Sequence, residues 1–307
     1  MGGGTFDRSA YASFSAATST KTTEEIYDRG SMHKLLDPKG VKVRESRDSA
    51  DNPQSTPIIV GLDVTGSMGM IADVIAREGL GTLFTGILDR KPVTDPHVMF
   101  MGIGDVDYDS APLQVSQFEA DNRIVEQLTN LWLEHGGGGN CHESYDLPWY
   151  FAAMHTVHDA MEKRGKRGYL FTVGDEEVPE GLHPHHIERV LGYTPETEYS
   201  VNQLLEMAQR SYDVFHIVVR EGSHCRHPSG YNAVRASWTN LLGQHVIVLE
   251  DHKALAETIV TAIEVAEGRD AATSAKGWGR RAGAVLEATR HLPKGSGGTR
   301  PRLGLSK

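Results

Sequence analysis

Apolar and polar positions alternate along most of the chain in blocks that suit strands and helices in turn. Apolar runs bounded by glycine, proline or polar residues predict strands at 57–64, 97–104, 168–173, 213–220 and 245–249, with a short extended piece at 113–118. Amphipathic stretches between them predict helices at 70–88, 121–134, 144–164, 198–211 and 252–267. Each parallel crossover needs a helix that packs back on the sheet. This order therefore predicts an α/β fold with a doubly wound, mostly parallel sheet and helices on both faces.

The two ends of the chain differ in composition from its middle. Residues 1–54 are rich in Ser, Thr, Gly and charge, which predicts an irregular or disordered arm, and residues 269–307 predict a flexible basic tail. A single α/β domain is predicted between them, at 55–268. Its core can be substantial, because 39% of the 307 residues are apolar.

The net charge of −10 is unevenly distributed along the sequence. From residue 270 to the end there are eight Lys and Arg residues against two acids, so the rest of the chain is strongly acidic. An acidic body disfavours nucleic acid as the main partner, leaving the basic tail as the part that could contact it. The body suits cations and basic segments of other proteins.

Cysteine use and hydropathy indicate the compartment. Cys141 and Cys225 are the two cysteines, and they form neither a CxxC pair nor a disulfide framework. The first residues lack the basic start and apolar stretch of a signal peptide, and no window has the roughly 18 apolar residues of a membrane span. We therefore expect a reduced, cytoplasmic protein without a membrane partner.

The segment Asp63-Val-Thr-Gly-Ser67 places one carboxylate and two hydroxyls where a buried strand turns into a helix. Asp105 and Asp175 follow other predicted strands, and ligands of doubly wound folds bind beyond the carboxyl ends of the strands. Oxygen ligands of this kind suit Mg²⁺, which keeps several waters in a near-octahedral shell. Alternatively, Asp63 and Thr65 cap the helix that follows.

The same segment resembles the DxSxS-type first loop of the metal-ion-dependent adhesion site of von Willebrand factor A domains, with Thr65 in place of the first Ser. The resemblance covers roughly residues 55–268. It implies a doubly wound fold and a site for Mg²⁺, with Mn²⁺ as a substitute. It further implies that Thr65 and Ser67 coordinate the ion directly while Asp63 acts through water.

Two later loops complete the site in that family. The family's third-loop Asp corresponds to Asp175 in Gly168-Tyr-Leu-Phe-Thr-Val-Gly-Asp175. The second loop of the family supplies a Thr, which is missing from Gly136-Gly-Gly-Gly-Asn-Cys-His-Glu-Ser144. Asn140, which can offer a carbonyl oxygen, is the first candidate for this position, and Ser144 is the second.

The resemblance also implies a function. Such domains bind an acidic side chain of a partner protein through the open position on the metal, and they change no bond of that partner. Intracellular bacterial or phage members suggest an adaptor that works with an ATPase of the AAA type or with a kinase-associated complex. On this interpretation the protein is not an enzyme.

Two other functions are compatible with the same residues. Asp63-Val-Thr-Gly-Ser67 also resembles the nucleophile motif of haloacid-dehalogenase-type phosphotransferases, which would make Asp63 a covalent nucleophile assisted by Mg²⁺. Against this, Thr65 replaces the second Asp of that motif, and the predicted helix leaves no room for the small flap. The third possibility is a structural protein with a vestigial metal site.

Other polar clusters have plainer interpretations. Asp107 and Asp109 are predicted to be solvated loop charges. Ser223-His-Cys-Arg-His227 has too few ligands for a closed zinc site, so a polar loop is expected there.

Overall fold

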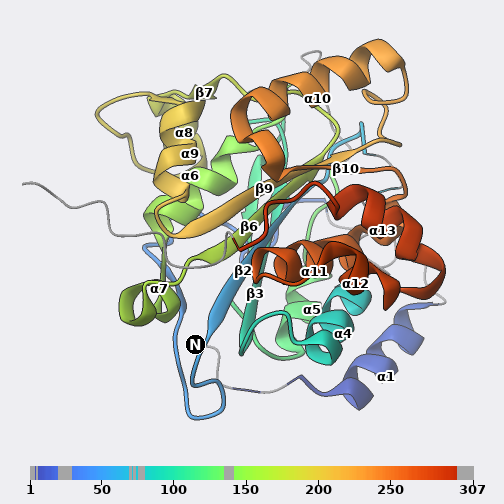
Figure 1. Cartoon of the computed structure of the whole chain (residues 1–307). Coiled ribbons are helices and arrows are strands. Elements are labelled where there is room, and N and C mark those ends of the chain that lie inside the picture. Colours follow the sequence, from blue (N-terminus) through green and yellow to red (C-terminus); the bar gives the residue numbers. More distant parts are fainter. Residues whose placement is uncertain are drawn as a thin grey trace, which may run out of the picture.

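The computed structural model of the chain describes residues 4, 6–19, 30–68, 71, 74, 80–134 and 142–295 (Figure 1). Its centre is a six-stranded sheet with the order β10-β9-β6-β2-β3-β4. The strands are β2 (Thr56–Asp63), β3 (Pro96–Ile103), β4 (Leu113–Val115), β6 (Gly168–Gly174), β9 (Tyr212–Val219) and β10 (Val246–Leu249). Only the pair β3–β4 is antiparallel among them. The predicted doubly wound, mostly parallel fold is confirmed.

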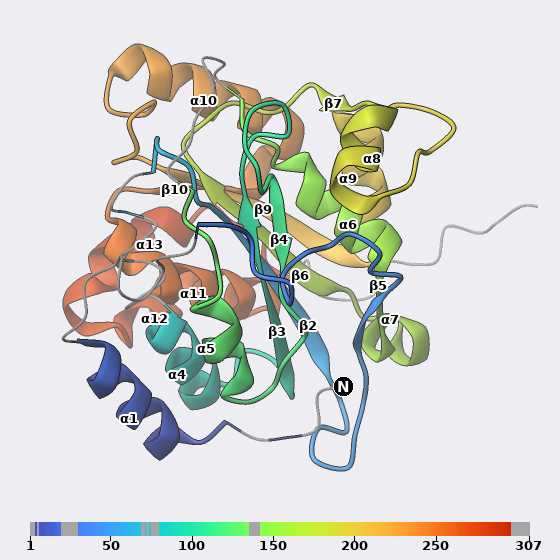
Figure 2. The same ribbon diagram turned by 180° about the vertical axis from the view of Figure 1, so that it is seen from behind.

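Helices cover both faces of this sheet, as Figures 1 and 2 show from opposite sides. One layer contains α4 (Leu80–Arg90), α5 (Arg123–Leu128), α11 (Leu255–Ala266), α12 (Ala271–Lys276) and α13 (Ala282–Thr289). The other contains α6 (Asp146–His155), α8 (Pro184–Leu191), α9 (Val201–Ala208) and α10 (Pro228–Leu242). Side chains alternate between the layers: Ile58 and Val60 of β2 pack in the first, and Ile59 packs in the second.

The predicted helix at 144–164 is interrupted. After α6 the chain forms β5 (Thr156–His158), which pairs in parallel with β1 (Arg44–Ser46), and then α7 (Asp159–Arg164). Thr156 and Val157 are β-branched and favour extended backbone, and β1 offers a partner that the local pattern does not reveal. The predicted helix at 70–88 lies partly outside the described residues, and its described part is α4 with the helical residues 71 and 74.

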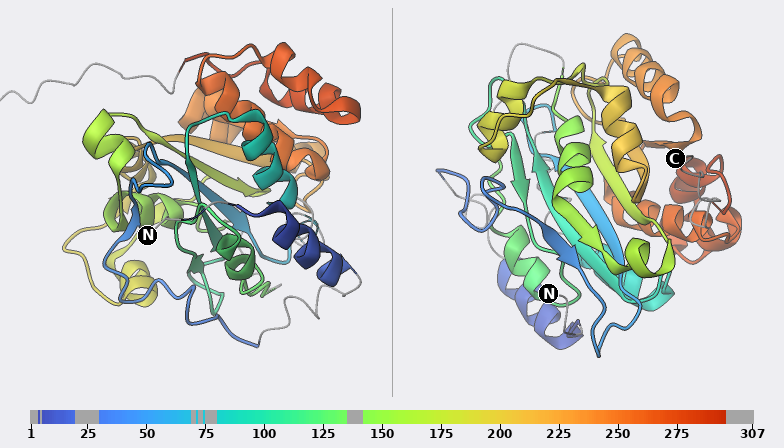
Figure 3. Two further views of the ribbon diagram at one scale, coloured as in Figure 1. Left: turned by 90° about the horizontal axis from the view of Figure 1, so that it is seen from below. Right: turned by 90° about the vertical axis from the view of Figure 1, so that its left-hand side faces the viewer.

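Both chain ends contain more structure than their composition predicts. The N-terminal segment includes the helix α1 (Arg8–Ser19), which lies beside α4 and α5 in Figures 2 and 3. The prediction of a flexible tail is wrong for its first part, because α12 and α13 bury Ala275, Val285 and Ala288 against the core. Residues 296–307 lie outside the described residues.

Further elements were not predicted from the sequence, namely the helices α8 and α10 and the short strands β7 (Gly181–Leu182) and β8 (Tyr199–Ser200). The two strands pair with each other, and β7 precedes α8 while β8 precedes α9 along the chain. None of the helices that the structure describes has the length and apolar character needed to cross a membrane.

Candidate metal centre

The candidate centre lies where the strand order of the sheet reverses. From β2 the chain continues to β3 on one side, and it later returns as β6 on the other side of β2. Asp63 is the last residue of β2, and Asp175 directly follows β6. Two parallel neighbours that end at the same edge bring these carboxylates together at the switch point, where doubly wound folds bind their ligands.

A row of short polar contacts joins the two strand ends, with a hydrogen bond at each end and the two hydroxyl oxygens side by side between them. Asp63 Oδ1 accepts hydrogen bonds from the Thr65 backbone N–H (2.9 Å) and hydroxyl (2.7 Å). Thr65 Oγ1 lies 3.2 Å from Ser67 Oγ, and the Ser67 hydroxyl donates to Asp175 Oδ1 at 2.8 Å. The structure thus gathers four of the predicted ligands around one point. Their binding of a metal stays a prediction.

The remaining oxygens of the two carboxylates are also fixed. The Tyr145 hydroxyl donates to Asp63 Oδ2 at 2.7 Å, and the His224 backbone N–H donates to Asp175 Oδ2 at 2.9 Å. Tyr145 is fully buried and packs edge-on against the rings of His216 and Trp238. Tyr145 could not be identified from the sequence, because nothing in the local pattern shows that the start of α6 faces β2.

Two glycines make room for these contacts. A Cβ on Gly174 would lie 2.0 Å from the Tyr145 hydroxyl oxygen, and a Cβ on Gly222 would lie 2.4 Å from the Asp175 carboxylate. Neither distance is compatible with a side chain unless the neighbours move.

Further buried acids lie around these four side chains. Asp105, Glu143 and Glu176 are each less than 5% exposed, and each has one carboxylate oxygen without a hydrogen-bond partner. Buried carboxylates normally have partners, because desolvation of an unpaired charge is costly. Such oxygens are satisfied either by a bound cation or by a proton on the carboxyl group.

The electrostatics of these acids agree with their crowding. Burial, reinforced by the charge of Asp175, raises the pKa of Asp63 to about 7. Burial, then the charges of Asp63 and Asp175, raises the pKa of Glu176 to about 9. For Glu143, burial and the charges of Asp63 and Glu176 also raise the pKa strongly. Without a cation, the site therefore disfavours full ionisation.

The second loop is described only in part. Asn140 lies outside the described residues. The Ser144 hydroxyl oxygen accepts the Val106 backbone N–H at 2.9 Å, so in this structure it supports the loop after β3. In that loop Asp109 is buried, contrary to its predicted solvation, and its Oδ2 accepts the Asp105 backbone N–H at 2.8 Å. Asp107 is exposed, as predicted.

The predicted polar loop at 223–227 packs beneath the candidate centre. Cys225 is buried, its thiol donates to the Asp175 backbone carbonyl over 3.4 Å, and burial raises its pKa to about 12. The His224 ring contacts Glu176, with Nε2 and Oε1 2.8 Å apart. These contacts position the Asp175 segment.

Comparisons with known proteins add no family assignment. No family model matches the chain, and no curated protein matches it. Among solved structures, the pilus adhesin SpaC from Lactobacillus rhamnosus GG in its open conformation aligns with a TM-score of 0.46 and 14% identity, covering 74% of this chain and 31% of the adhesin. The mussel byssus protein PTMP1 aligns with a TM-score of 0.41 and 10% identity, covering 68% of this chain and 46% of PTMP1.

A von Willebrand factor type A protein from Catenulispora acidiphila also aligns, with a TM-score of 0.35 and 14% identity, covering 70% of this chain and 43% of that protein. The chain thus matches less than half of each of these proteins. The assignment of the fold rests on its own strand order and helix layers.

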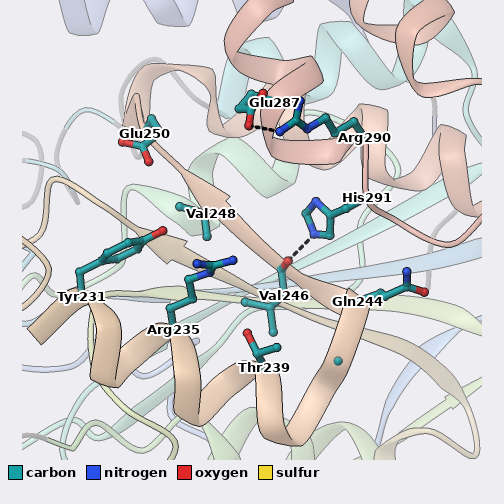
Figure 4. A pocket seen from close by; sticks show the side chains of 11 residues that line it. Tyr231, Arg235, Thr239, Gln244, Val246, Val248, Glu250, Glu287, Arg290 and His291 are labelled. Atoms are coloured by element: carbon teal, nitrogen blue, oxygen red, sulfur yellow. Dashed lines mark hydrogen bonds and ion pairs between the residues drawn. The ribbon is translucent and has the colours of Figure 1, made fainter. Parts of the chain in front are cut away.

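Two of the cavities lined by described residues lie at separate places on the molecule. One, of about 410 Å³, adjoins the candidate centre and is lined by Asp105, Glu143 and residues at the start of α8. The other, of about 650 Å³, lies against the edge strand β10 and shares no lining residue with the centre (Figure 4). There Arg290 pairs with Glu287, and His291 Nε2 is 2.7 Å from the Val246 carbonyl oxygen.

Proposed function

We propose that this chain is a Mg²⁺-dependent protein-interaction module that binds an acidic group of a partner. Thr65, Ser67 and Asp175 would hold the ion, and Asp63 would support them through its hydrogen bonds. The bound ion would supply an open coordination position for the partner's carboxylate. The second-loop ligand, Asn140 or Ser144, is left open in this proposal.

One observation carries the proposal. Asp63 and Asp175 accept hydrogen bonds from the Thr65 and Ser67 hydroxyls, whose oxygens lie 3.2 Å apart, so four oxygen-bearing side chains from both strand ends meet at the switch point. Helix capping by Asp63 and Thr65 does not account for the participation of Asp175, which comes from another strand. Nor does it account for the unpartnered oxygens of Glu143 and Glu176 nearby.

The geometry favours binding over phosphotransfer by Asp63. A nucleophilic carboxylate needs a free oxygen that a substrate can reach. Asp63 has no exposed surface, and both of its oxygens already accept hydrogen bonds from Thr65 and Tyr145. Its constrained position suits a supporting role at a metal site.

For the partner, we propose a protein of an intracellular complex, with AAA-type ATPases and kinase-associated assemblies as the first classes to test. The proposal places the chain in the cytoplasm as an adaptor. Capture from a lysate should be lost on chelation and in Ser67→Ala. Capture of the same partner under all conditions would contradict metal-dependent binding.

Calorimetric titration tests the metal site directly. Mg²⁺ and Mn²⁺ are titrated into the wild type, Asp63→Ala, Ser67→Ala and the control Ser229→Ala, whose residue is exposed on α10. We expect one bound ion in the wild type and in the control, and at least tenfold weaker binding in the two site variants, the loss expected for groups that hold or orient a metal. Equal binding by all four proteins would overturn the proposal.

A further inference from the structure

A cluster of imidazoles stands at the start of α8, on the rim of the 410 Å³ cavity. The sequence His183-Pro-His-His186 begins this helix, and Asp107 of the loop after β3 faces it. Ligand atoms of Asp107, His185 and His186 all lie within 4.8 Å of one another. No residue of this group belongs to the candidate Mg²⁺ centre.

We propose that His185, His186 and Asp107 form a second metal site, which binds Zn²⁺. Two imidazole nitrogens and a carboxylate oxygen are a donor set that suits Zn²⁺ and not Mg²⁺, which prefers oxygen. Three protein ligands leave a coordination position open to water or to a small ligand in the cavity, the arrangement typical of reactive zinc sites.

The local hydrogen bonds are compatible with this role. His186 Nε2 is 3.3 Å from Asp107 Oδ1, so a shared cation would replace a direct contact between these two side chains. His186 Nδ1 accepts the His183 backbone N–H over a long 3.3 Å. Metal binding through Nε2 moves the ring proton to Nδ1, so only this weak hydrogen bond is lost.

The neighbouring histidine supports the cluster. The His183 ring stacks on His185 with their centroids 5.6 Å apart, and its Nδ1 lies 3.1 Å from Glu198 Oε2. The Glu198 carboxylate therefore orients His183, which is not itself a proposed ligand, and His183 in turn packs against the ring of the ligand His185.

A separate observation also points to a cation in this cavity. Asp146 lines it, is 1% exposed, and has two carboxylate oxygens without a hydrogen-bond partner of standard geometry. Asp105 lines it as well, with Oδ2 unpartnered. The N-terminus of α8 carries a positive partial charge, which disfavours a cation. The carboxylates of Asp105, Asp107 and Asp146 supply a larger negative charge beside it.

Zinc at this position would join two elements that already touch. The Arg189 guanidinium of α8 donates to the backbone carbonyls of Val106 and Asp109, the latter at 2.6 Å. The same loop carries Asp105 next to the Mg²⁺ centre, and the Asp107 N–H donates to Asp105 Oδ1 at 2.7 Å. The zinc site would thus fix the loop that borders the first site.

Titration of Zn²⁺ in the presence of excess Mg²⁺ tests this site, using the full chain without a histidine tag. The variants are His185→Gln and Asp107→Asn, both at exposed positions, so each is expected to fold. His227→Gln, an exposed histidine that makes no side-chain cap on α10, is the control. Circular dichroism verifies the fold of each variant.

We expect one tight Zn²⁺ ion in the wild type and in the control. Each of the two site variants should bind more than about tenfold more weakly, since even outer partners of a metal commonly cost that much. Co²⁺ in the same place should give a visible absorption spectrum of low-symmetry coordination that is lost in His185→Gln. Equal Zn²⁺ affinity in all four proteins, or no tight ion in the wild type, would overturn the proposal.

Ser67→Ala separates this proposal from the Mg²⁺ proposal. If both sites exist, Ser67→Ala loses Mg²⁺ and keeps Zn²⁺, because its side chain contacts none of the zinc ligands. Loss of Zn²⁺ in this variant alone, with His185→Gln unaffected, would place the zinc at the first site and refute the second.

Discussion

Single atoms determine the candidate centre, and Gly174 shows how narrow the tolerance is. A methyl group on this residue would lie 2.0 Å from the Tyr145 hydroxyl oxygen, where Tyr145 holds Asp63. Tyr145 is fixed by Trp238 and His216, so it cannot simply turn away. The packing of the centre is therefore determined by a residue that has no side chain.

We predict that Gly174→Ala lowers the free energy of unfolding by about 1–3 kcal/mol, the usual cost of overpacking a filled core. It should also weaken Mg²⁺ binding, because Tyr145 must move from Asp63. The control is Gly283→Ala in α13, where a Cβ meets nothing within 4 Å and a small stabilisation is expected. Urea unfolding measures both variants, and equal stability of the two would contradict the packing argument.

Buried histidines make the stability depend on pH. Burial lowers the pKa of His158 to about 4, below the ordinary value near 6.5 of the unfolded chain. Between about pH 6.5 and pH 4 the unfolded state therefore binds a proton at His158 that the native state does not bind. The free energy of unfolding falls as the pH decreases through this range. Burial also lowers the pKa of His97, to about 4.

We predict that His158 alone accounts for a loss of about 2 kcal/mol in unfolding free energy between pH 7 and pH 5. His158→Asn should reduce the pH dependence by that amount, because Asn keeps an acceptor for the Met161 N–H at the start of α7 and does not titrate. Urea unfolding at both pH values tests this. An unchanged pH slope in the variant would show that folding does not lower the pKa of His158.

At the scale of elements, the buried parallel strands were predictable and the helices at the periphery were not. The apolar runs of β2, β3, β6 and β9 are covered on both faces, so their sequences are almost continuously hydrophobic. By contrast, α10 has only Val234, Trp238 and Leu242 buried among polar and small residues, which gives a weak periodic signal.

The site followed the same rule. The positions of Asp63 and Asp175 at one edge of the sheet could be predicted, because Asp63 ends one apolar strand and Asp175 directly follows another. Glu143 and Tyr145 could not be assigned, since their approach to Asp63 depends on the path of the chain into α6.

The C-terminal helices give the clearest element-scale prediction. Trp278 donates from Nε1 to Thr261 Oγ1 at 2.8 Å, and the Arg90 guanidinium lies 4.3 Å from its ring centroid. Replacing a large aromatic side chain with alanine in a packed site lowers the free energy of unfolding. For Trp278→Ala we expect a loss of about 2 kcal/mol, less than for a fully buried ring because Trp278 is partly exposed. Arg290→Ala, an exposed control on the same segment, should change stability by less than about 0.5 kcal/mol.

Chemical unfolding monitored by far-ultraviolet circular dichroism compares the two variants. If residues 269–295 were the flexible tail that composition alone predicts, both would behave like the wild type.

At the scale of the whole molecule, the candidate centre concentrates negative charge within an already acidic protein. The chain carries a net charge of −10, and Asp63, Asp175 and Glu176 are buried at one edge of the sheet. Charges of one sign in a low-dielectric environment repel strongly, and only the native fold forces them together. The centre therefore reduces the stability of the metal-free protein, and an ion bound only by the native state would offset that loss.

We predict that Mg²⁺ at 100 times its dissociation constant raises the free energy of unfolding by about 2.7 kcal/mol. Chelation should reverse the gain, and Ser67→Ala should show little of it because the Ser67 hydroxyl joins the two strand ends. Urea unfolding is compared with NaCl at matched ionic strength, since screening alone relieves part of the repulsion at the acidic surface. Equal stabilisation by NaCl and MgCl₂ would contradict this prediction, and so would equal stabilisation of the wild type and Ser67→Ala by MgCl₂. Either result would mean that screening, and not a bound ion, reduces the repulsion between the carboxylates.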